Sequence, residues 1–156
     1  MASISRGMSR LFALALLASV ATSAGAQKPA AKLTWGPVPP FLPAGATMAV
    51  VSGDPMKAGE YALQLKMPSG YTIPAHMHPT DEHLVVKSGA FKIGMGDAFD
   101  GRKLKTLRTG EKANAPARMN HYARASGPTV VEVSGTGPFA ITYVATGNST
   151  VPAKKK

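Results

Sequence analysis

Hydrophobic and polar residues alternate with a period of two through most of the chain after Thr47, in short runs separated by glycine and proline. Side chains two apart lie on the same face of a β-strand, so this alternation predicts strands with one buried face. β-Branched and aromatic residues are also frequent in these runs. The expected strands are residues 47–52, 61–67, 83–87, 91–95, 119–125, 129–134 and 139–145.

Turn-forming residues occupy the gaps between the runs, at residues 52–55, 68–70, 88–89, 100–101, 127–128 and 135–138. No stretch after residue 26 has a sustained 3.6-residue hydrophobic period with helix caps. Many short strands at regular spacing are typical of an antiparallel sandwich or barrel. We therefore expect one all-β domain at residues 46–146, with the form of a jelly roll (a double-stranded β-helix).

Both flanks of this domain differ from it in composition. Residues 27–45 are rich in proline, which lacks the N–H donor that a central strand needs. They are predicted to form an N-terminal arm that lies along the domain, with Trp35, Phe41 and Leu42 as anchors. Residues 147–156 end in three lysines and are predicted to be a disordered basic tail.

The first 26 residues have the three zones of a secretory signal peptide in the right order. Arg6 and Arg10 make a basic start, residues 11–21 are apolar except for one serine, and Ala24-Gly25-Ala26 fits the A-x-A cleavage rule. The alternative is a membrane anchor, but this apolar run is well short of the ~20 residues that span a bilayer. We expect cleavage after Ala26, a secreted or periplasmic location, and no membrane attachment after cleavage.

Cysteine content and charge narrow the possible chemistry. The chain has no cysteine, so any bound ion must use nitrogen and oxygen ligands. Loss of two arginines with the signal peptide leaves 16 basic and 8 acidic residues, a net charge of +8 instead of +10. The basic residues are scattered except for the last three lysines, and no aromatic residues are interleaved with them. Nucleic-acid binding is therefore not expected.

All four histidines fall in two places, with His76, His78 and His83 in one and His121 in the other. On a strand, His76 and His78 share a face, and this spacing suits two imidazoles that bind one ion. After a short turn, Glu82 can return beside them as an oxygen ligand, and His121 can complete the set from a later strand. His83 is expected to face away, either at the surface or in a hydrogen bond to a ligand.

These residues fit a known pattern. Gly70, five residues, His76-Met77-His78, three residues, Glu82, six residues and Gly89 resemble the first motif of the cupin superfamily at every defined position and spacing. Agreement over twenty residues is a specific signal. The resemblance implies a small, single-domain cupin with a jelly-roll barrel.

A second cupin motif is matched in part. Gly110, five residues, Pro116 and then His121 have the expected separations. Arg118 stands where the family usually has glycine, and Ala125 stands where it often has asparagine. These departures concern the local turn and a substrate contact, and they leave His121 in place.

The resemblance implies that His76, His78, Glu82 and His121 are ligands of one divalent transition-metal ion. Three imidazoles and one carboxylate suit Mn²⁺, Fe²⁺, Ni²⁺, Cu²⁺ or Zn²⁺. If the ion is octahedral, positions remain for water, substrate or oxygen, as metal-assisted chemistry requires.

Two kinds of function are compatible with such a site. One is a metal-dependent oxygenase, isomerase or lyase that acts on a small oxygen-rich molecule, and the other is a non-catalytic module that binds or senses a small ligand or metal. A purely structural metal is a weaker alternative, because structural zinc sites are commonly thiolate-rich. Tyr71, Met95, Tyr122 and Tyr143 are candidates to line the pocket or simply to fill the core. The exposed arm is consistent with a homodimer.

Overall fold

The computed structural model describes residues 32–145. The predicted signal peptide, the first residues of the predicted arm and the basic tail lie outside the described residues. Within residues 32–145 there is no helix long and apolar enough to cross a membrane. The elements of this part of the chain are β1 (Gly36–Pro37), β2 (Thr47–Ser52), β3 (Gly59–Met67), β4 (Thr72–Met77), β5 (Glu82–Ser88), β6 (Ala90–Met95), the short 3₁₀ helix η1 (Gly101–Lys103), β7 (Lys105–Arg108), β8 (Lys112–Ala115), β9 (His121–Ala125), β10 (Thr129–Gly137) and β11 (Thr142–Tyr143).

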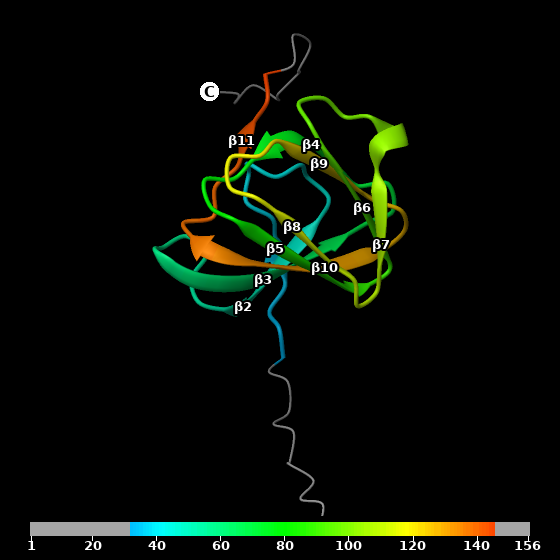
Figure 1. Cartoon of the computed structure of the whole chain (residues 1–156). Coiled ribbons are helices and arrows are strands. Elements are labelled where there is room, and N and C mark those ends of the chain that lie inside the picture. The colour runs from blue at the N-terminus through cyan, green and yellow to red at the C-terminus, as the bar shows by residue number, and fades with distance from the viewer. Residues whose placement is uncertain (1–31, 146–156) are drawn as a thin grey trace, which may run out of the picture. The chain divides into compact units, whose positions relative to one another are not determined.

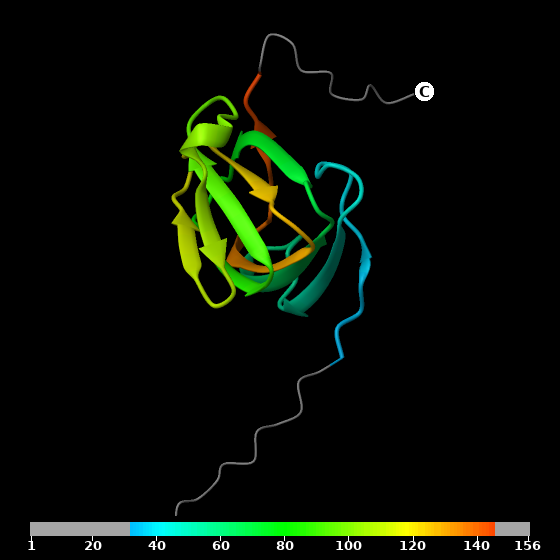
Figure 2. The same ribbon diagram turned by 90° about the vertical axis from the view of Figure 1, so that its right-hand side faces the viewer.

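The strands form two antiparallel sheets that face each other (Figures 1 and 2). One sheet has the order β1-β2-β3-β10-β5-β8, and the other has the order β11-β4-β9-β6-β7. After β3 the chain changes sheets at every connection except the one from β6 to β7. This repeated crossing is the jelly-roll arrangement, so the all-β prediction is confirmed.

The space between the sheets is filled by alternate residues of the longest strands. In β3 the residues from Tyr61 to Met67 are buried at every second position, and β10 has the same pattern. Leu63 pairs with Val133 and Leu65 pairs with Val131, and all four are at most 5% exposed. Burial of one such side chain contributes about 1.5–3 kcal/mol. These rows therefore hold the larger sheet against the smaller one.

Two tyrosine hydroxyls hold the segment before β2 against the barrel. One tyrosine belongs to β11 of the smaller sheet, and the other directly precedes β4. The Tyr143 hydroxyl donates a hydrogen bond of 2.8 Å to the carbonyl of Phe41, and the Tyr71 hydroxyl donates one to the carbonyl of Pro43. Between these two anchors, Leu42 is only 5% exposed and joins the core. The proline-rich segment thus closes part of the barrel.

Several strand bounds differ from those expected. β9 begins at His121 instead of Met119, because Arg118 has a positive φ of 60° and still belongs to a turn. β10 continues through the predicted turn at residues 135–138 as far as Gly137, since Gly135 pairs with strands on both sides. The last predicted strand, residues 139–145, is reduced to Thr142–Tyr143.

Four strands were absent from the predicted set, and one of them is the two-residue β1 in the proline-rich segment. β4 carries His76, which the histidine spacing had placed on a strand without defining its range. β7 and β8 lie at the edges of the two sheets, and most of their residues are exposed. Edge strands tolerate charged side chains, and each of these two has only four residues with one of them buried, so the sequence signal is weak.

Candidate metal centre

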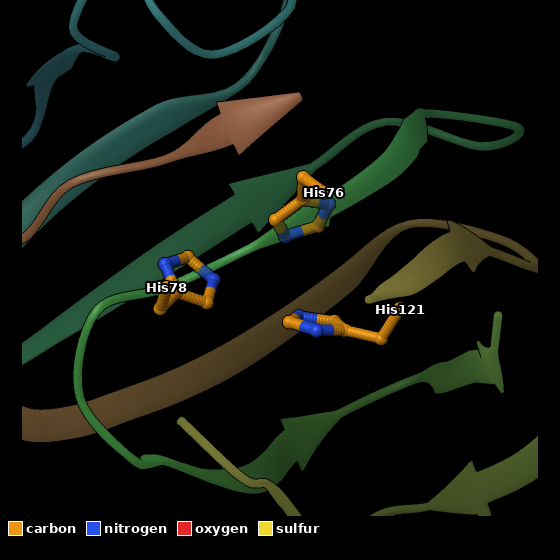
Figure 3. A group of neighbouring side chains, drawn as sticks. All are labelled: His76, His78 and His121. Atoms are coloured by element: carbon orange, nitrogen blue, oxygen red, sulfur yellow. The ribbon is translucent and has the colours of Figure 1, made fainter. Parts of the chain in front are cut away.

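Three histidine rings meet inside the barrel (Figure 3). His76 lies in β4, His78 follows that strand directly, and His121 opens the neighbouring strand β9. The backbone ladder pairs His76 with His121. One ring nitrogen from each histidine lies within 4.8 Å of those of the other two, and the three residues are at most 4% exposed. Two distant parts of the sequence thus supply one cluster.

Glu82 completes this cluster from the facing sheet, where it begins β5. Its Oε1 atom is 3.4 Å from Nε2 of His78, and its Oε2 atom is 3.4 Å from Nε2 of His121. Glu82 is 7% exposed and is the only buried carboxylate among residues 32–145. The four residues predicted as ligands therefore lie side by side.

Backbone carbonyls orient all three rings through the nitrogen that faces away from the cluster. The Nδ1 contacts are His76 to Pro74 at 2.6 Å, His78 to Ala140 at 2.8 Å and His121 to Met119 at 3.0 Å. A carbonyl can only accept, so in each pair Nδ1 carries the proton and donates it. In a neutral ring, Nε2 is then the nitrogen with the free lone pair.

One of these Nε2 atoms has no hydrogen-bond partner. Nε2 of His78 is fully buried, and although Oε1 of Glu82 is 3.4 Å away, the two groups are not aligned for a hydrogen bond. A buried polar atom left unpaired costs about 1–3 kcal/mol. An inward-facing lone pair without a donor is the state that a metal ligand needs. Three such imidazoles and a carboxylate fit a divalent transition-metal ion.

Without an ion, His76 and Glu82 are in the protonation states that suit a cation, whereas His121 favours a proton that a cation would displace. Burial, helped by the neighbouring His121, lowers the pKa of His76 to about 4. Burial raises the pKa of Glu82, but the hydrogen bond from His121 and the charges of the histidines outweigh it, so the net pKa is lowered. Burial lowers the pKa of His121, yet its hydrogen bonds to Glu82 and to the Met119 carbonyl raise it overall. Glu82 is thus a carboxylate beside a neutral His76.

The turn before β9 places an arginine in a backbone conformation that glycine adopts more readily. Arg118 adopts φ of 60°, in the left-handed region that favours glycine. Its amide donates a hydrogen bond to the carbonyl of His78 at 2.8 Å, and the amide of Ala117 donates one to Oδ1 of Asp81 at 2.7 Å. These bonds join the turn to the segment that carries His78 and Glu82.

The four ligand residues open into a small apolar cavity. It has a volume of about 20 Å³, room for one or two water molecules. Apart from the four ligand residues, its walls are made only of alanine, valine, leucine, isoleucine, methionine and phenylalanine side chains. Any polar recognition inside this cavity must therefore come from the ligand cluster itself.

Comparisons with known proteins identify the fold. No protein-family model matches the sequence, and no curated protein is similar to it. Among solved structures, an RmlC-like cupin from Shewanella frigidimarina superposes with a TM-score of 0.55 at 13% identity, covering 72% of this chain and 91% of that one. The protein has the cupin fold.

Two further structures are similar to this cupin-fold protein. A putative acetylacetone dioxygenase from Methylibium petroleiphilum has a TM-score of 0.59 at 17% identity, covering 86% of this chain and 89% of that one. The polyketide cyclase RemF from Streptomyces resistomycificus has a TM-score of 0.55 at 16% identity, covering 69% of this chain and 75% of that one. At these identities the likeness concerns the fold.

The candidate pocket residues of this cupin-fold protein lie around the cavity rather than in its wall. Tyr71 and Tyr143 hold the segment before β2, although the Tyr143 ring lies 5.8 Å from the ring of His76. Tyr122 points to the outer side of β9, where its hydroxyl donates to the carbonyl of Asp100 at 3.3 Å. Met95 ends β6 and is 43% exposed.

Two side chains of the site were not anticipated from the sequence. Leu42 lines the cavity from the proline-rich segment, and Phe139 stacks on the ring of His78 at 5.3 Å between centroids. Nothing in the local sequence distinguishes them from other apolar residues, so only the fold brings them here. His83 is exposed, and its Nδ1 lies 2.9 Å from Oδ1 of Asn114, on the face of β5 opposite to Glu82.

Proposed function

We propose that this cupin-fold protein binds one divalent transition-metal ion through His76, His78, Glu82 and His121, and that it is a metal-dependent oxygenase, isomerase or lyase for a small oxygen-rich molecule. The main support for this proposal is that backbone carbonyls hold all three Nδ1 atoms, so that Nε2 is the nitrogen that faces the cluster at Glu82 in every ring. A bound divalent ion supplies a Lewis acid that polarises a carbonyl or enol oxygen.

The protein's own groups have three roles in this proposal. The carbonyl contacts fix the tautomer and the orientation of each imidazole. Glu82 contributes a negative charge that balances the cation, in a position where solvent screens it little. The apolar walls exclude water, which strengthens electrostatic interactions at the reacting oxygen.

Elemental analysis of the purified protein tests the metal site. We expect about one divalent ion per chain, and loss of that ion in the double variant His76→Ala/His121→Ala. His83→Ala is the matched control, because it removes an exposed imidazole that follows Glu82 directly. Full metal content in the double variant would refute the site.

Catalysis is tested separately from metal binding. Oxygen uptake and product formation are measured with iron- and manganese-loaded protein over a panel of small diketones, phenols and sugar acids. Turnover that depends on the loaded metal supports an enzyme. Tight ligand binding without turnover across the panel would instead favour the binding module, since the cupin fold does not distinguish the two.

We also propose that the chain is exported and that cleavage follows Ala26. The three zones of residues 1–26 support this proposal. Material recovered from outside the cytoplasm should begin at Gln27 or its cyclised form. Exported protein that still begins at Met1 would contradict it.

A homodimer is our proposal for the assembly. Within the described residues, β1 pairs with β2 only at Thr47 and Met48, so the rest of that edge has unpaired backbone groups. Val50 and Val51 on this stretch are 43% and 42% exposed. Exposed apolar edges of this kind favour pairing with another strand. Light scattering should give twice the chain mass, and Val50→Lys should shift it toward the monomer.

A further inference from the structure

Three basic residues that are scattered along the sequence come together on the outer face of the smaller sheet. They are Lys92 of β6, Arg108 of β7 and Arg124 of β9, which are neighbouring strands (Figure 1). In the ladder, Lys92 is directly opposite Arg124, and Arg108 is opposite Ala90, two residues before Lys92. Directly opposed Cβ atoms are about 5 Å apart, and diagonal ones about 7–8 Å. We call these three residues the basic cluster.

The side chains of the basic cluster point away from the barrel interior. Ile93 and Ala123, which follow Lys92 and precede Arg124, line the inner cavity, and successive residues of a strand point to opposite faces. Arg108 and Arg124 are exposed, and Lys92 is half-buried. The cluster thus lies on the other side of the sheet from the candidate metal centre.

No carboxylate neutralises the basic cluster. Within residues 32–145 none of its members forms an ion pair, whereas Lys57, Lys87 and Arg102 each do. All eight acidic residues of the chain fall in this range, so no acidic side chain elsewhere can pair with the cluster. Glu111 lies at its edge, where its carboxylate accepts a hydrogen bond of 2.6 Å from the backbone amide of Arg108. The cluster therefore carries uncompensated positive charge.

The arrangement of these charges favours an anion as the partner. Like charges directly opposite each other on a sheet are destabilising, and Lys92 faces Arg124 in this way. An anion bound between them would remove the repulsion. The guanidinium of Arg124 can donate two parallel hydrogen bonds to a planar carboxylate, and Lys92 can add a third.

The neighbouring hydroxyls suit a partner that also carries hydroxyl groups. Thr72 lies opposite Arg124, and Thr106 lies opposite Lys92, so one polar row crosses four strands over about 14 Å. The Thr72 hydroxyl already donates to the carbonyl of Gly70 at 3.0 Å, so toward a partner it can only accept. A sugar hydroxyl can donate to it, whereas an ionised phosphate offers only acceptors. The row therefore favours a carbohydrate over a phosphate surface.

An exposed aromatic ring lies beside the same row. Tyr122, two residues before Arg124, also points outward, and the ring of Phe99 packs on it at 5.1 Å between centroids. Phe99 itself is 40% exposed. The face of an aromatic ring is electron-rich and apolar, so it can contact the C–H groups of a sugar ring. Cations, an acceptor hydroxyl and an aromatic face thus share one side of the sheet.

We propose that the outer face of the smaller sheet binds an acidic polysaccharide, a linear chain that carries carboxylates among its hydroxyl groups. The basic cluster binds the carboxylates, Thr72 accepts a hydrogen bond from a sugar hydroxyl, and Phe99 contacts a sugar ring. This inference goes beyond the proposed metal chemistry and does not depend on it, so either can fail alone.

The test measures binding of the full-length protein to carboxymethyl-dextran by titration calorimetry at low ionic strength, with plain dextran as the matched uncharged polymer. The protein should bind only the carboxymethylated polymer, and added salt should weaken this binding because exposed charges are screened. Lys92→Gln/Arg124→Gln should weaken it by about 10-fold to 30-fold, and its Tm should not fall, since a repulsion is removed. Glu111→Gln should bind more tightly, and Thr72→Val more weakly.

A matched control separates the cluster from the net charge of the chain. Lys57→Gln/Lys112→Gln removes the same charge from exposed positions outside the smaller sheet and should bind like the unmodified protein. Equal weakening in both double variants would overturn the inference in favour of net charge. Unchanged binding in Lys92→Gln/Arg124→Gln, with loss when the three terminal lysines become serine, would assign binding to the tail instead. Equal or tighter binding to phosphatidylglycerol vesicles or duplex DNA would also overturn it.

Discussion

The backbone amide of Arg118 donates a hydrogen bond of 2.8 Å to the carbonyl of His78. This contact joins the turn before β9 to the end of β4, and the same turn contains the Met119 carbonyl that orients His121. The positions of two predicted ligands thus depend on one turn. Within this turn Arg118 adopts a left-handed backbone conformation, which costs about 1–2 kcal/mol for a residue with a Cβ atom.

Replacement of Arg118 by glycine should stabilise the protein. Arg118→Gly removes the left-handed penalty, and part of this gain is offset by the greater backbone entropy of glycine in the unfolded chain. We expect the free energy of unfolding to rise by about 0.5–1 kcal/mol, measured by urea denaturation. Arg118→Ala keeps the penalty and should change little. Destabilisation by both substitutions would show that the arginine side chain supports the turn, and destabilisation by glycine but not by alanine would contradict the expected relief of the left-handed penalty.

Removal of the metal should lower stability in a way that depends on the histidine cluster. An ion at about 100 times its dissociation constant stabilises the folded state by about 2.7 kcal/mol. Addition of a chelator should therefore lower Tm by on the order of 10 °C. The Tm of His78→Ala should not respond to metal or chelator, whereas His83→Ala should respond fully. An unchanged Tm in the unmodified, metal-loaded protein would argue against a folded-state metal site.

Gly94 should not tolerate even one added methyl group. A Cβ atom at this position would overlap the ring of Tyr122, which is completely buried on the neighbouring strand. Gly94→Ala should destabilise the protein by about 1–3 kcal/mol, as overpacking usually does. Gly101→Ala is the control, because a Cβ atom there has no neighbour within 4 Å. Thermal unfolding compares the two, and equal Tm values would show that Tyr122 can move aside.

Alkaline pH should destabilise the fold through its buried tyrosines. Burial, together with neighbouring Tyr143, raises the pKa of Tyr71 from 10.0 to about 12. Burial also raises the pKa of Tyr143, and burial with the charge of Glu82 raises that of Tyr61. The unfolded chain then loses its phenol protons first, so stability falls as the pH rises above 10.

Two measurements check this alkaline effect. The free energy of unfolding should be smaller at pH values above 10 than at neutral pH. In the folded protein the tyrosinate absorbance should also rise at a higher pH than in urea-denatured protein. Coincident titration curves for the folded and denatured chains would contradict the burial of these hydroxyls.

Strand bounds were predictable where one face of a strand is buried and the other is solvated. Residues 91–95 alternate clearly and correspond to β6 within one residue, and residues 61–67 alternate in the same way inside β3. The edge strands β7 and β8 were missed because each has only four residues and one buried side chain, which is too little sequence to define a period of two. The predicted turn at residues 135–138 was largely wrong, because ladder bonds on both sides extend β10 through its glycines.

The sequence by itself indicated which residues could bind an ion, because a pair of histidines two apart on a strand, a carboxylate shortly after them and a distant histidine restrict the chemistry before any fold is known. It could not determine which aromatic residues face the cavity. Both sides of a barrel wall can be apolar when a loop covers the outer side. Phe99, in the connection after β6, packs on Tyr122 of β9 in this way. Tertiary structure alone decided that Leu42 and Phe139 reach the site and that Met95 stands beside His121, since strand register and packing between distant segments are not local properties.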